Sequence, residues 1–361
     1  MIGSTTGLGD GNFHMTFVNQ IIFASSGLVI MLLLAFIRFD FIAKFYLPMY
    51  AVNIGLLILV LFINQGGNAS VARWIGVDIG GIQFGIQPSE FAKILMIIFL
   101  AKMIDKYKDK INNVLVLLML FGATVIPVAL IFLQPSYSAS MVVLFILFIM
   151  LFSGGIGYRY IVIPAVILAP LLLFLFIDLH AENPIFIDRV LADWQIQRVW
   201  YFLYPELDYS DRTFQNRAAL QAMSSGLLTG RGLFNNTIFV PESSNDFIFA
   251  IIAAELGFLG TLSLISISFV IVIRCFIIAN RSYSNVGKLI ASGVGGVIAF
   301  QVIMNVAVNT WVLPNTGVNF PFISSGGSSM WVFMGGIGIV LNIGMMKEVS
   351  MFDDLLGVQT K

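Results

Sequence analysis

Residues 240–250 read Val-Pro-Glu-Ser-Ser-Asn-Asp-Phe-Ile-Phe-Ala, and the apolar run 251–258 follows directly. This stretch places two carboxylates, Glu242 and Asp246, at the point where a long polar loop enters a membrane helix. A carboxylate at that boundary is costly unless it has a partner or a function. One interpretation makes both acids N-terminal caps, which the helix dipole stabilises. The other makes them part of a functional site, and the rest of the chain favours the second.

The composition is that of a polytopic integral membrane protein. Hydrophobic residues make up 58% of the 361 residues, charged residues 11%, and the mean hydropathy is +0.95, a balance that no soluble domain of this length shows. The net charge is zero, so nothing indicates nucleic acid as a partner. With two histidines and one cysteine, the chain has no disulfide framework, and a zinc, haem or iron–sulfur site is not expected.

Nine apolar runs follow a polar lead at residues 1–16, and most are near the ~20 residues that a spanning helix needs. They lie at about 17–37, 45–63, 88–104, 114–133, 139–153, 160–178, 246–274, 289–313 and 328–346. We therefore expect an all-α fold, a single membrane domain over residues 1–361 with about nine transmembrane helices. An odd number of spans puts the two termini on opposite sides of the membrane.

Lysine and arginine occur in every second loop, which marks that side as cytoplasmic. They are Arg38, Lys44, Lys102, Lys106, Lys108, Lys110, Arg159, Arg274, Arg281, Lys288, Lys347 and Lys361. The tail 347–361 is then cytoplasmic, and the lead 1–16 and the long loop 179–245 are extracytoplasmic. A loop of that length is usually functional. Its aromatic residues predict that part of it lies on the membrane surface: Trp194, Trp200, Tyr201 and Tyr204.

The segment 87–93, Gln-Pro-Ser-Glu-Phe-Ala-Lys, has the pattern of a helix start with proline in the first turn. Glu90 and Lys93 are three residues apart and share a helix face, which indicates an ion pair. The alternative is that Lys93 and Arg73 form a cationic patch suited to a phosphate or pyrophosphate. Trp74, beside Arg73, has the character of an interfacial aromatic residue.

Residues 309–329 interrupt two spans with prolines and glycines. Irregular backbone at that depth must be buried in protein or line a cavity. Within it, Ser324, Ser325, Gly326 and Gly327 offer hydroxyl and backbone N–H groups to an anion. A plain turn with serine caps is the other interpretation.

Four motifs, in this order, resemble the SEDS family of RodA, FtsW and SpoVE, and the similarity runs from about residue 17 to 346. They are Asn-x-x-x-Ala-Arg-Trp-Ile at 68–75, Gln-Pro-Ser-Glu-Phe-Ala-Lys at 87–93, Pro-Glu-x-x-x-Asp-Phe-Ile-Phe-Ala-Ile-Ile at 241–252, and Pro-Phe-Ile-Ser-x-Gly-Gly-Ser-Ser at 321–329. The resemblance implies a peptidoglycan glycosyltransferase that polymerises lipid II, the undecaprenyl-pyrophosphate-linked disaccharide peptide, into glycan strands. It implies action at the outer face of the bacterial cytoplasmic membrane, surrounded by membrane lipid, with a class B penicillin-binding protein as transpeptidase. The wall made would serve cell shape, division or sporulation.

By the same resemblance, the functional acid of the family falls on Asp246, its Arg-Trp pair on Arg73 and Trp74, its long-loop arginine on Arg198, and its loop glutamine on Gln215. The chain also departs from the family pattern. Ser136 stands where an acid is frequent, Ala219 where serine is usual, and Ala254 replaces the first of two adjacent acids, leaving Glu255. Family members usually have ten spans, so we expect this sequence to begin after the first of them, with either a misassigned start or a lost helix as the reason.

The hypothesis for the chemistry is that Asp246 removes the proton of a sugar hydroxyl, a role worth ~10²–10⁴ in rate. Arg73, Lys93 and Arg198 stabilise the departing pyrophosphate, and Glu242 orients the acceptor or assists Asp246. A single base predicts inversion at the anomeric carbon. No ligand cluster demands a metal, but a divalent cation, Mg²⁺ or Mn²⁺, that bridges the pyrophosphate stays open. Two alternatives are a flippase for the lipid-linked precursor and a catalytically weak scaffold for a transpeptidase.

Overall fold

The computed structural model describes residues 11–63, 73–79, 82–134, 136–179, 193–207, 213–235 and 238–355. Several sequence predictions lie outside these residues. They are the lead before residue 11, the motif residues 68–72, parts of the long loop and the end of the tail.

Nine long helices in the described part of the chain correspond to the nine apolar runs. They are α2 (Gly11–Phe36), α4 (Tyr46–Ile63), α5 (Pro88–Lys106), α6 (Val114–Leu133), α7 (Tyr137–Ser153), α8 (Arg159–Leu179), α12 (Ile248–Arg281), α13 (Asn285–Asn309) and α14 (Gly327–Leu355). Six of them, namely α2, α4, α6, α12, α13 and α14, contain stretches long and apolar enough to cross a membrane, and α7 is apolar but shorter at 17 residues. The prediction of a helical, multi-pass membrane protein is confirmed.

Shorter elements connect the long helices. They are α3 (Phe39–Lys44), the 3₁₀ turns η1 (Lys108–Lys110) and η2 (Pro205–Leu207), α10 (Asp193–Leu203) and α11 (Phe214–Ser225). A β-hairpin, which the sequence analysis did not predict, joins β1 (Ile75–Ile79) to β2 (Ile82–Ile86), with Ile75 opposite Ile86. Its signal was present: apolar residues alternate on both sides of a Gly-Gly pair at 80–81, a pattern typical of a hairpin. The fold is therefore helical with one small hairpin.

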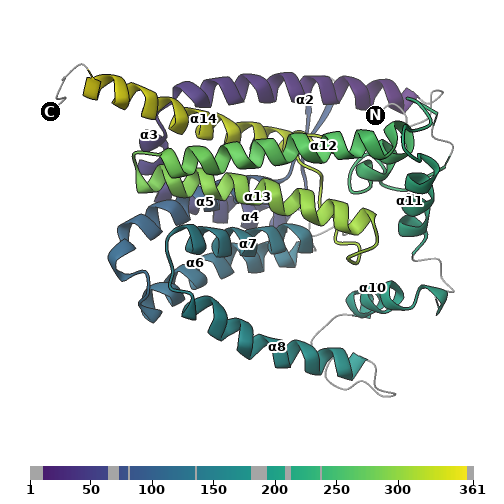
Figure 1. Ribbon diagram of the computed structural model, residues 1–361, viewed down its shortest axis with the longest axis horizontal. Helices are drawn as coiled ribbons and strands as arrows, with labels where there is room; N and C mark the ends of the chain where they lie inside the picture. The colour runs from purple at the N-terminus through teal and green to yellow at the C-terminus, as the bar shows by residue number, and fades with distance from the viewer. Residues whose placement is uncertain are drawn as a thin grey trace.

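The long helices, α8 apart, lie side by side (Figure 1). Helix α2 packs along α14, α12 along α13, and α5 contacts α4, α7 and α13. Figure 1 shows α10 and α11 at one end of this bundle and α3 at the other. We name the first the cavity end, because the cavity described below lies there, and the second the basic end, because α3 and η1 carry Lys44, Lys108 and Lys110.

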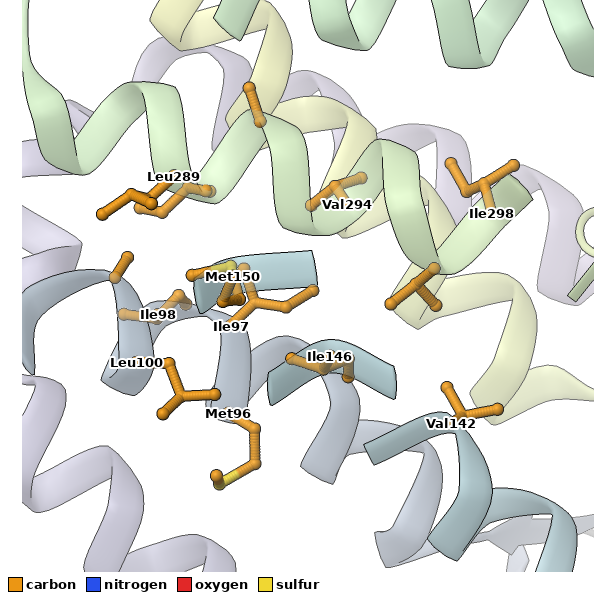
Figure 2. Close-up of a cluster of buried hydrophobic side chains, with 14 of the residues drawn as sticks. Met96, Ile97, Ile98, Leu100, Val142, Ile146, Met150, Leu289, Val294 and Ile298 are labelled. Carbon is orange, nitrogen blue, oxygen red and sulfur yellow. The ribbon is translucent and has the colours of Figure 1, made fainter. Parts of the chain in front are cut away.

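The buried core holds α5, α7 and α13 together (Figure 2). It is formed by Met96, Ile97 and Leu100 of α5, Val142, Ile146 and Met150 of α7, and Leu289, Val294 and Ile298 of α13. A Cβ atom on Gly293 would lie 2.7 Å from the Met150 sulfur, so glycine there allows α13 to approach α7 closely. Close packing of this kind, rather than exclusion of water, drives association of helices in lipid. It fixes the cavity ends of α5 and α13 relative to each other.

Candidate active site

The start of α12 brings Asp246 to the cavity end without making it a cap. The helix begins at Ile248, its N-cap residue Phe247 makes no side-chain cap hydrogen bond, and no acid lies in its first turn. Neither Glu242 nor Asp246 therefore acts as a helix cap. Glu242 has a φ of 52°, a left-handed conformation that is uncommon for a residue other than glycine and that bends the chain before Asp246.

Two buried amides of α13 form hydrogen bonds with the backbone at the start of α12, as a capping side chain would. Asn305 and Asn309 donate from Nδ2 to the backbone carbonyl of Asp246, at 2.8 and 3.0 Å, and Asn309 Oδ1 accepts from the Ala250 N–H at 3.1 Å. These bonds fix the backbone of Asp246 and leave its side chain available. Within the described residues, no hydrogen bond or ion pair engages the Asp246 carboxylate.

The Asp246 side chain faces a cavity of about 720 Å³. Residues from seven parts of the chain line it: Arg73 and Trp74; Gln87, Glu90 and Lys93 at the start of α5; Ser136, Tyr137, Ser138, Ala139 and Val142 around the start of α7; Arg198 and Gln215 of the long loop; Glu242 and Asn245 before α12; Gln301 of α13; and Asn315, Thr316, Gly317, Val318, Asn319 and Ser325 after α13. The lining brings together residues of all four motifs, which are separate in the sequence, and Ser325 is the contribution of the fourth motif.

Several polar atoms in this lining are buried and have no hydrogen-bond partner among the described residues. They are Arg73 Nε, Glu90 Oε2, Gln301 Oε1 and Thr316 Oγ1. Buried polar groups in folded proteins are almost always hydrogen-bonded, and an unpaired one typically costs ~1–3 kcal/mol. Four such atoms around one cavity indicate a site built for a polar ligand that supplies the missing bonds.

The surroundings of Asp246 raise the pKa of its carboxyl group towards neutral pH. The pKa of Asp246 is raised from 3.8 to about 6, chiefly by burial and also by the negative charge of Glu242, while the positive charges of Arg73 and Arg198 act in the opposite direction. Burial also lowers the pKa of Arg198, while the charge of Asp246 acts in the opposite direction. A carboxylate with a pKa near the working pH is suited to act as a general base.

Lys93 and Glu90 form the ion pair that their spacing predicts. Lys93 Nζ lies 2.7 Å from Glu90 Oε1, and the two side chains are only 3% and 6% exposed. The Lys93 ammonium also lies 5.7 Å from the centroid of the Phe333 ring. Because both charged residues line the cavity, the ion-pair and cationic-patch interpretations are compatible.

The serine-rich segment supports the stretch that carries the acids. Ser324 Oγ donates to the Asn245 carbonyl at 2.7 Å, Ser325 Oγ donates to Asn245 Oδ1 at 2.5 Å, and the Ser325 N–H donates to the Ser244 carbonyl at 2.8 Å. Only Ser325 of the four predicted anion-binding residues lines the cavity; Ser324, Gly326 and Gly327 do not. Anion binding by these four residues stays a prediction.

The long-loop residues reach the cavity through the segment 310–319. Arg198 Nη1 donates to the Asn315 carbonyl at 3.1 Å, and Asn315 Nδ2 donates to Gln215 Oε1 at 3.2 Å. Trp74 lies on Gly85 of the hairpin, where a Cβ atom would come within 2.9 Å of its ring. The structure thus brings Arg73, Trp74, Arg198 and Gln215 to the same cavity as Asp246.

The positions that depart from the family pattern fall in two places. Ser136 is buried and lines the cavity, so the acid that is frequent in the family at this position is absent from the cavity lining. Ala219 and Ala254 are fully buried in an apolar cluster with Phe247. The neighbouring acid Glu255 does not line the cavity; its Oε1 accepts from the Phe234 N–H at 3.2 Å.

Sequence reasoning missed Gln301, Asn305, Asn309, Asn315 and Thr316. Asn305 and Asn309 had a signal, since amides four residues apart in an apolar helix share one face and need partners. Among the described residues, no group of three or more His, Cys, Asp or Glu side chains is placed to hold a metal ion.

The comparisons with known proteins agree with the geometry. A family model of FtsW, RodA and SpoVE, described as cell cycle protein, matches residues 2–349. The chain is 30% identical over 346 residues to a probable peptidoglycan glycosyltransferase FtsW of Trichlorobacter lovleyi, covering 92% of this chain and 84% of that one.

Two solved structures share the fold. One, described as "Structural coordination of polymerization and crosslinking by a peptidoglycan synthase complex", has a TM-score of 0.76 and 26% identity, covering 96% of this chain and 93% of that one. The other is the crystal structure of the Thermus thermophilus rod shape determining protein RodA, with a TM-score of 0.66 and 25% identity, covering 96% of this chain and 91% of that one.

Proposed function

The chain belongs to the FtsW, RodA and SpoVE family, and from this premise we propose that it is a peptidoglycan glycosyltransferase whose catalytic centre is the cavity around Asp246. Its substrate is lipid II, a disaccharide peptide linked through a diphosphate to an undecaprenyl chain. One observation carries the assignment to this cavity: the Asp246 carboxylate, with a pKa raised to about 6, faces a space lined by Arg73, Lys93 and Arg198.

In the reaction, the 4-hydroxyl of an acceptor sugar attacks the anomeric carbon of a donor sugar. The new bond joins that oxygen to the anomeric carbon, and the bond from the carbon to the diphosphate oxygen breaks. Asp246 accepts the hydroxyl proton, and the undecaprenyl diphosphate leaves with the electron pair. Proton removal by a positioned base is typically worth ~10²–10⁴ in rate.

The cations act on the leaving group. Arg73 and Arg198 are close enough to Asp246 to influence its pKa, so a diphosphate beside them would lie next to the reacting centre. Lys93 forms an ion pair with Glu90 at 2.7 Å, and a bound diphosphate would compete with Glu90 for the Lys93 ammonium group. Electrostatic stabilisation of charge that develops on the leaving group is generally a large contribution to catalysis.

The stereochemistry follows from a single base. Direct attack by the acceptor, without an enzyme-bound sugar, inverts the configuration at the anomeric carbon. Asp246 and Glu242 line the cavity together with Arg73, Lys93 and Arg198, so these two carboxylates are the groups that would hold a Mg²⁺ or Mn²⁺ ion, which would neutralise part of the diphosphate charge. No step above depends on such an ion.

The position of the site in the cell and its partner complete the proposal. Lysines of α3 and η1 lie at the opposite end of the bundle, which, by the positive-inside rule, supports a cavity end outside the bacterial cytoplasmic membrane. A class B penicillin-binding protein would cross-link the strands made there. The similarity to a chain of a peptidoglycan synthase complex supports a partner of this kind.

The test is polymer formation from lipid II by the purified full-length chain in detergent, where there is no membrane to cross. We expect glycan strands from the parent protein, and a product from Asp246→Asn reduced ~10²-fold or more. Absence of polymer from the folded parent would contradict the proposal and favour a flippase or a scaffold. Rapid polymerisation by Asp246→Asn would support the glycosyltransferase assignment but would show that Asp246 is not the base.

A further inference from the structure

A second cavity, of about 400 Å³, lies beside the first. Its walls come from α10, the start of α11 and the segment after α13: Gln197, Arg198, Tyr201, Phe202, Thr213, Gln215, Asn216, Trp311, Pro314 and Asn315. Arg198, Gln215 and Asn315 also line the first cavity, so the two spaces are separated by shared walls. Its volume falls within the range of roughly 300–1,000 Å³ that is usual for small-molecule sites.

Hydrogen bonds connect the three walls of this second cavity. Arg198 Nη1 donates to the Asn315 carbonyl at 3.1 Å and joins α10 to the segment after α13. Asn315 Nδ2 donates to Gln215 Oε1 at 3.2 Å and joins that segment to α11. Trp311 Nε1 donates to the Phe202 carbonyl at 3.4 Å, a second link to α10. Hydrogen bonds between neighbouring walls therefore fix the shape of this cavity.

The lining combines aromatic rings with amides. Tyr201, Phe202 and Trp311 provide flat apolar surfaces, while Gln197, Gln215, Asn216 and Asn315 provide both hydrogen-bond donors and acceptors. A pyranose ring has the matching chemistry, because its C–H faces are apolar and its hydroxyl and N-acetyl groups both donate and accept. A lipid acyl chain does not match, because six of the ten lining residues carry Gln, Arg, Thr or Asn side chains.

We propose that the second cavity binds one sugar residue of the growing glycan strand, adjacent to the sugar that reacts beside Asp246. This inference rests on the proposed function and adds a binding site to it. The strand matches better than the diphosphate end of lipid II, because Arg198 is the only cation among the described residues of this lining and Arg73 and Lys93 line the first cavity but not this one. A strand held here stays attached after each addition, so the site promotes successive additions to the same strand.

The first experiment measures binding of a β-1,4-linked N-acetylglucosamine tetramer to the purified full-length chain. This probe has no diphosphate and no lipid, so it tests recognition of the strand separately from recognition of the donor. Removing one aromatic contact with Tyr201→Ala should weaken binding roughly 2- to 10-fold. Tyr201→Phe, which keeps the ring, should bind nearly as the parent does.

The matched control is Trp200→Ala, which removes an aromatic residue of the same helix that does not line the cavity and contacts Tyr204 instead. It should leave tetramer binding unchanged. Asp246→Asn should also bind the tetramer as the parent does, because it changes the reaction and not this site. Equal binding by Tyr201→Ala and the parent, or no binding by the folded parent, would overturn the inference.

A second readout is the length of strand made from lipid II. Compared at equal consumption of lipid II, Tyr201→Ala should make shorter strands than the parent, and Trp200→Ala should make strands of parental length. Unchanged strand length in Tyr201→Ala would count against the site. If the parent binds the tetramer in a Tyr201-dependent way but makes no polymer, the sugar site stands and the proposed reaction fails. If polymer forms without such binding, the reverse holds.

Discussion

The two ends of the helix bundle use the same kinds of polar side chain in opposite ways. At the basic end the buried Asn342 is paired, since it accepts from the Phe39 N–H at 2.9 Å and donates to the Ala35 carbonyl at 2.8 Å, and the half-buried Asn285 donates to Asp105 at 3.0 Å. At the cavity end, Arg73, Glu90, Gln301 and Thr316 each have a buried polar atom to which no other residue that the structure describes is hydrogen-bonded. Both ends are visible at opposite sides of the bundle in Figure 1.

The difference separates stability from function. Paired groups at the basic end satisfy the backbone where helices terminate, which stabilises the fold. Unpaired groups at the cavity end lower stability unless a ligand binds, and their clustering around one space indicates that a ligand is what they are for. Substitutions of the unpaired groups at the cavity end should therefore reduce activity more than stability, and substitutions of the paired groups at the basic end should do the reverse.

The largest expected effect compares two acids, one at each end. Asp246→Asn should lower the rate of lipid II polymerisation by ~10²–10⁴, whereas Asp105→Asn should change it little. Because the pKa of Asp246 is raised to about 6, the acid contributes stability at low pH that is lost as the pH rises through about 6. Asp246→Asn should thus melt at or above the parental temperature at neutral pH. A lower melting temperature would mean that the loss of activity reflects unfolding.

The second prediction concerns the buried pair at the start of α5. Lys93→Met leaves Glu90 charged and unpaired, which typically costs ~3–5 kcal/mol, so the melting temperature in detergent should drop strongly. Adding Glu90→Gln should restore most of the stability. Polymerisation should stay low in the double variant, because the cavity still lacks the positive charge of Lys93. Full recovery of activity would show that Lys93 serves the fold alone.

The third prediction removes a paired amide at the basic end. Asn342→Ala leaves the Phe39 N–H and the Ala35 carbonyl without their partner, a change worth ~1–3 kcal/mol. The melting temperature should fall, while the polymerisation rate of the folded fraction should equal that of the parent. A lower rate at equal folded fraction would remove the contrast between the two ends.

The smallest expected effect is a shift in pH dependence. The charge of Glu242 raises the pKa of Asp246, so Glu242→Gln should lower that pKa. The acid limb of kcat/KM against pH should then move to lower pH, with little change in the rate at neutral pH. An unmoved limb would show that Glu242 does not act on the base, and it would leave the exposed Glu242 only the role of orienting the acceptor.

Hydropathy alone was enough to predict the nine helices, because the length and apolar character of each run are local properties. The hairpin at 75–86 was missed because the apolar-run reading gave no weight to its period of two. The motifs brought Arg73, Lys93 and Asp246 together as a hypothesis, but Gln301, Asn315 and Thr316 carry no local signal. Their place in the cavity depends on how α13 packs against α5 and α7, which no single segment determines.

The most direct test of the account observes the ionisation of the base itself. We predict that kcat/KM of the purified parent protein for lipid II falls as the pH decreases through about 6, the pKa of Asp246, because the protonated carboxyl group cannot accept the hydroxyl proton. A value of kcat/KM that stays constant from well above to well below pH 6, in protein that remains folded, would contradict the claim that Asp246 is the base.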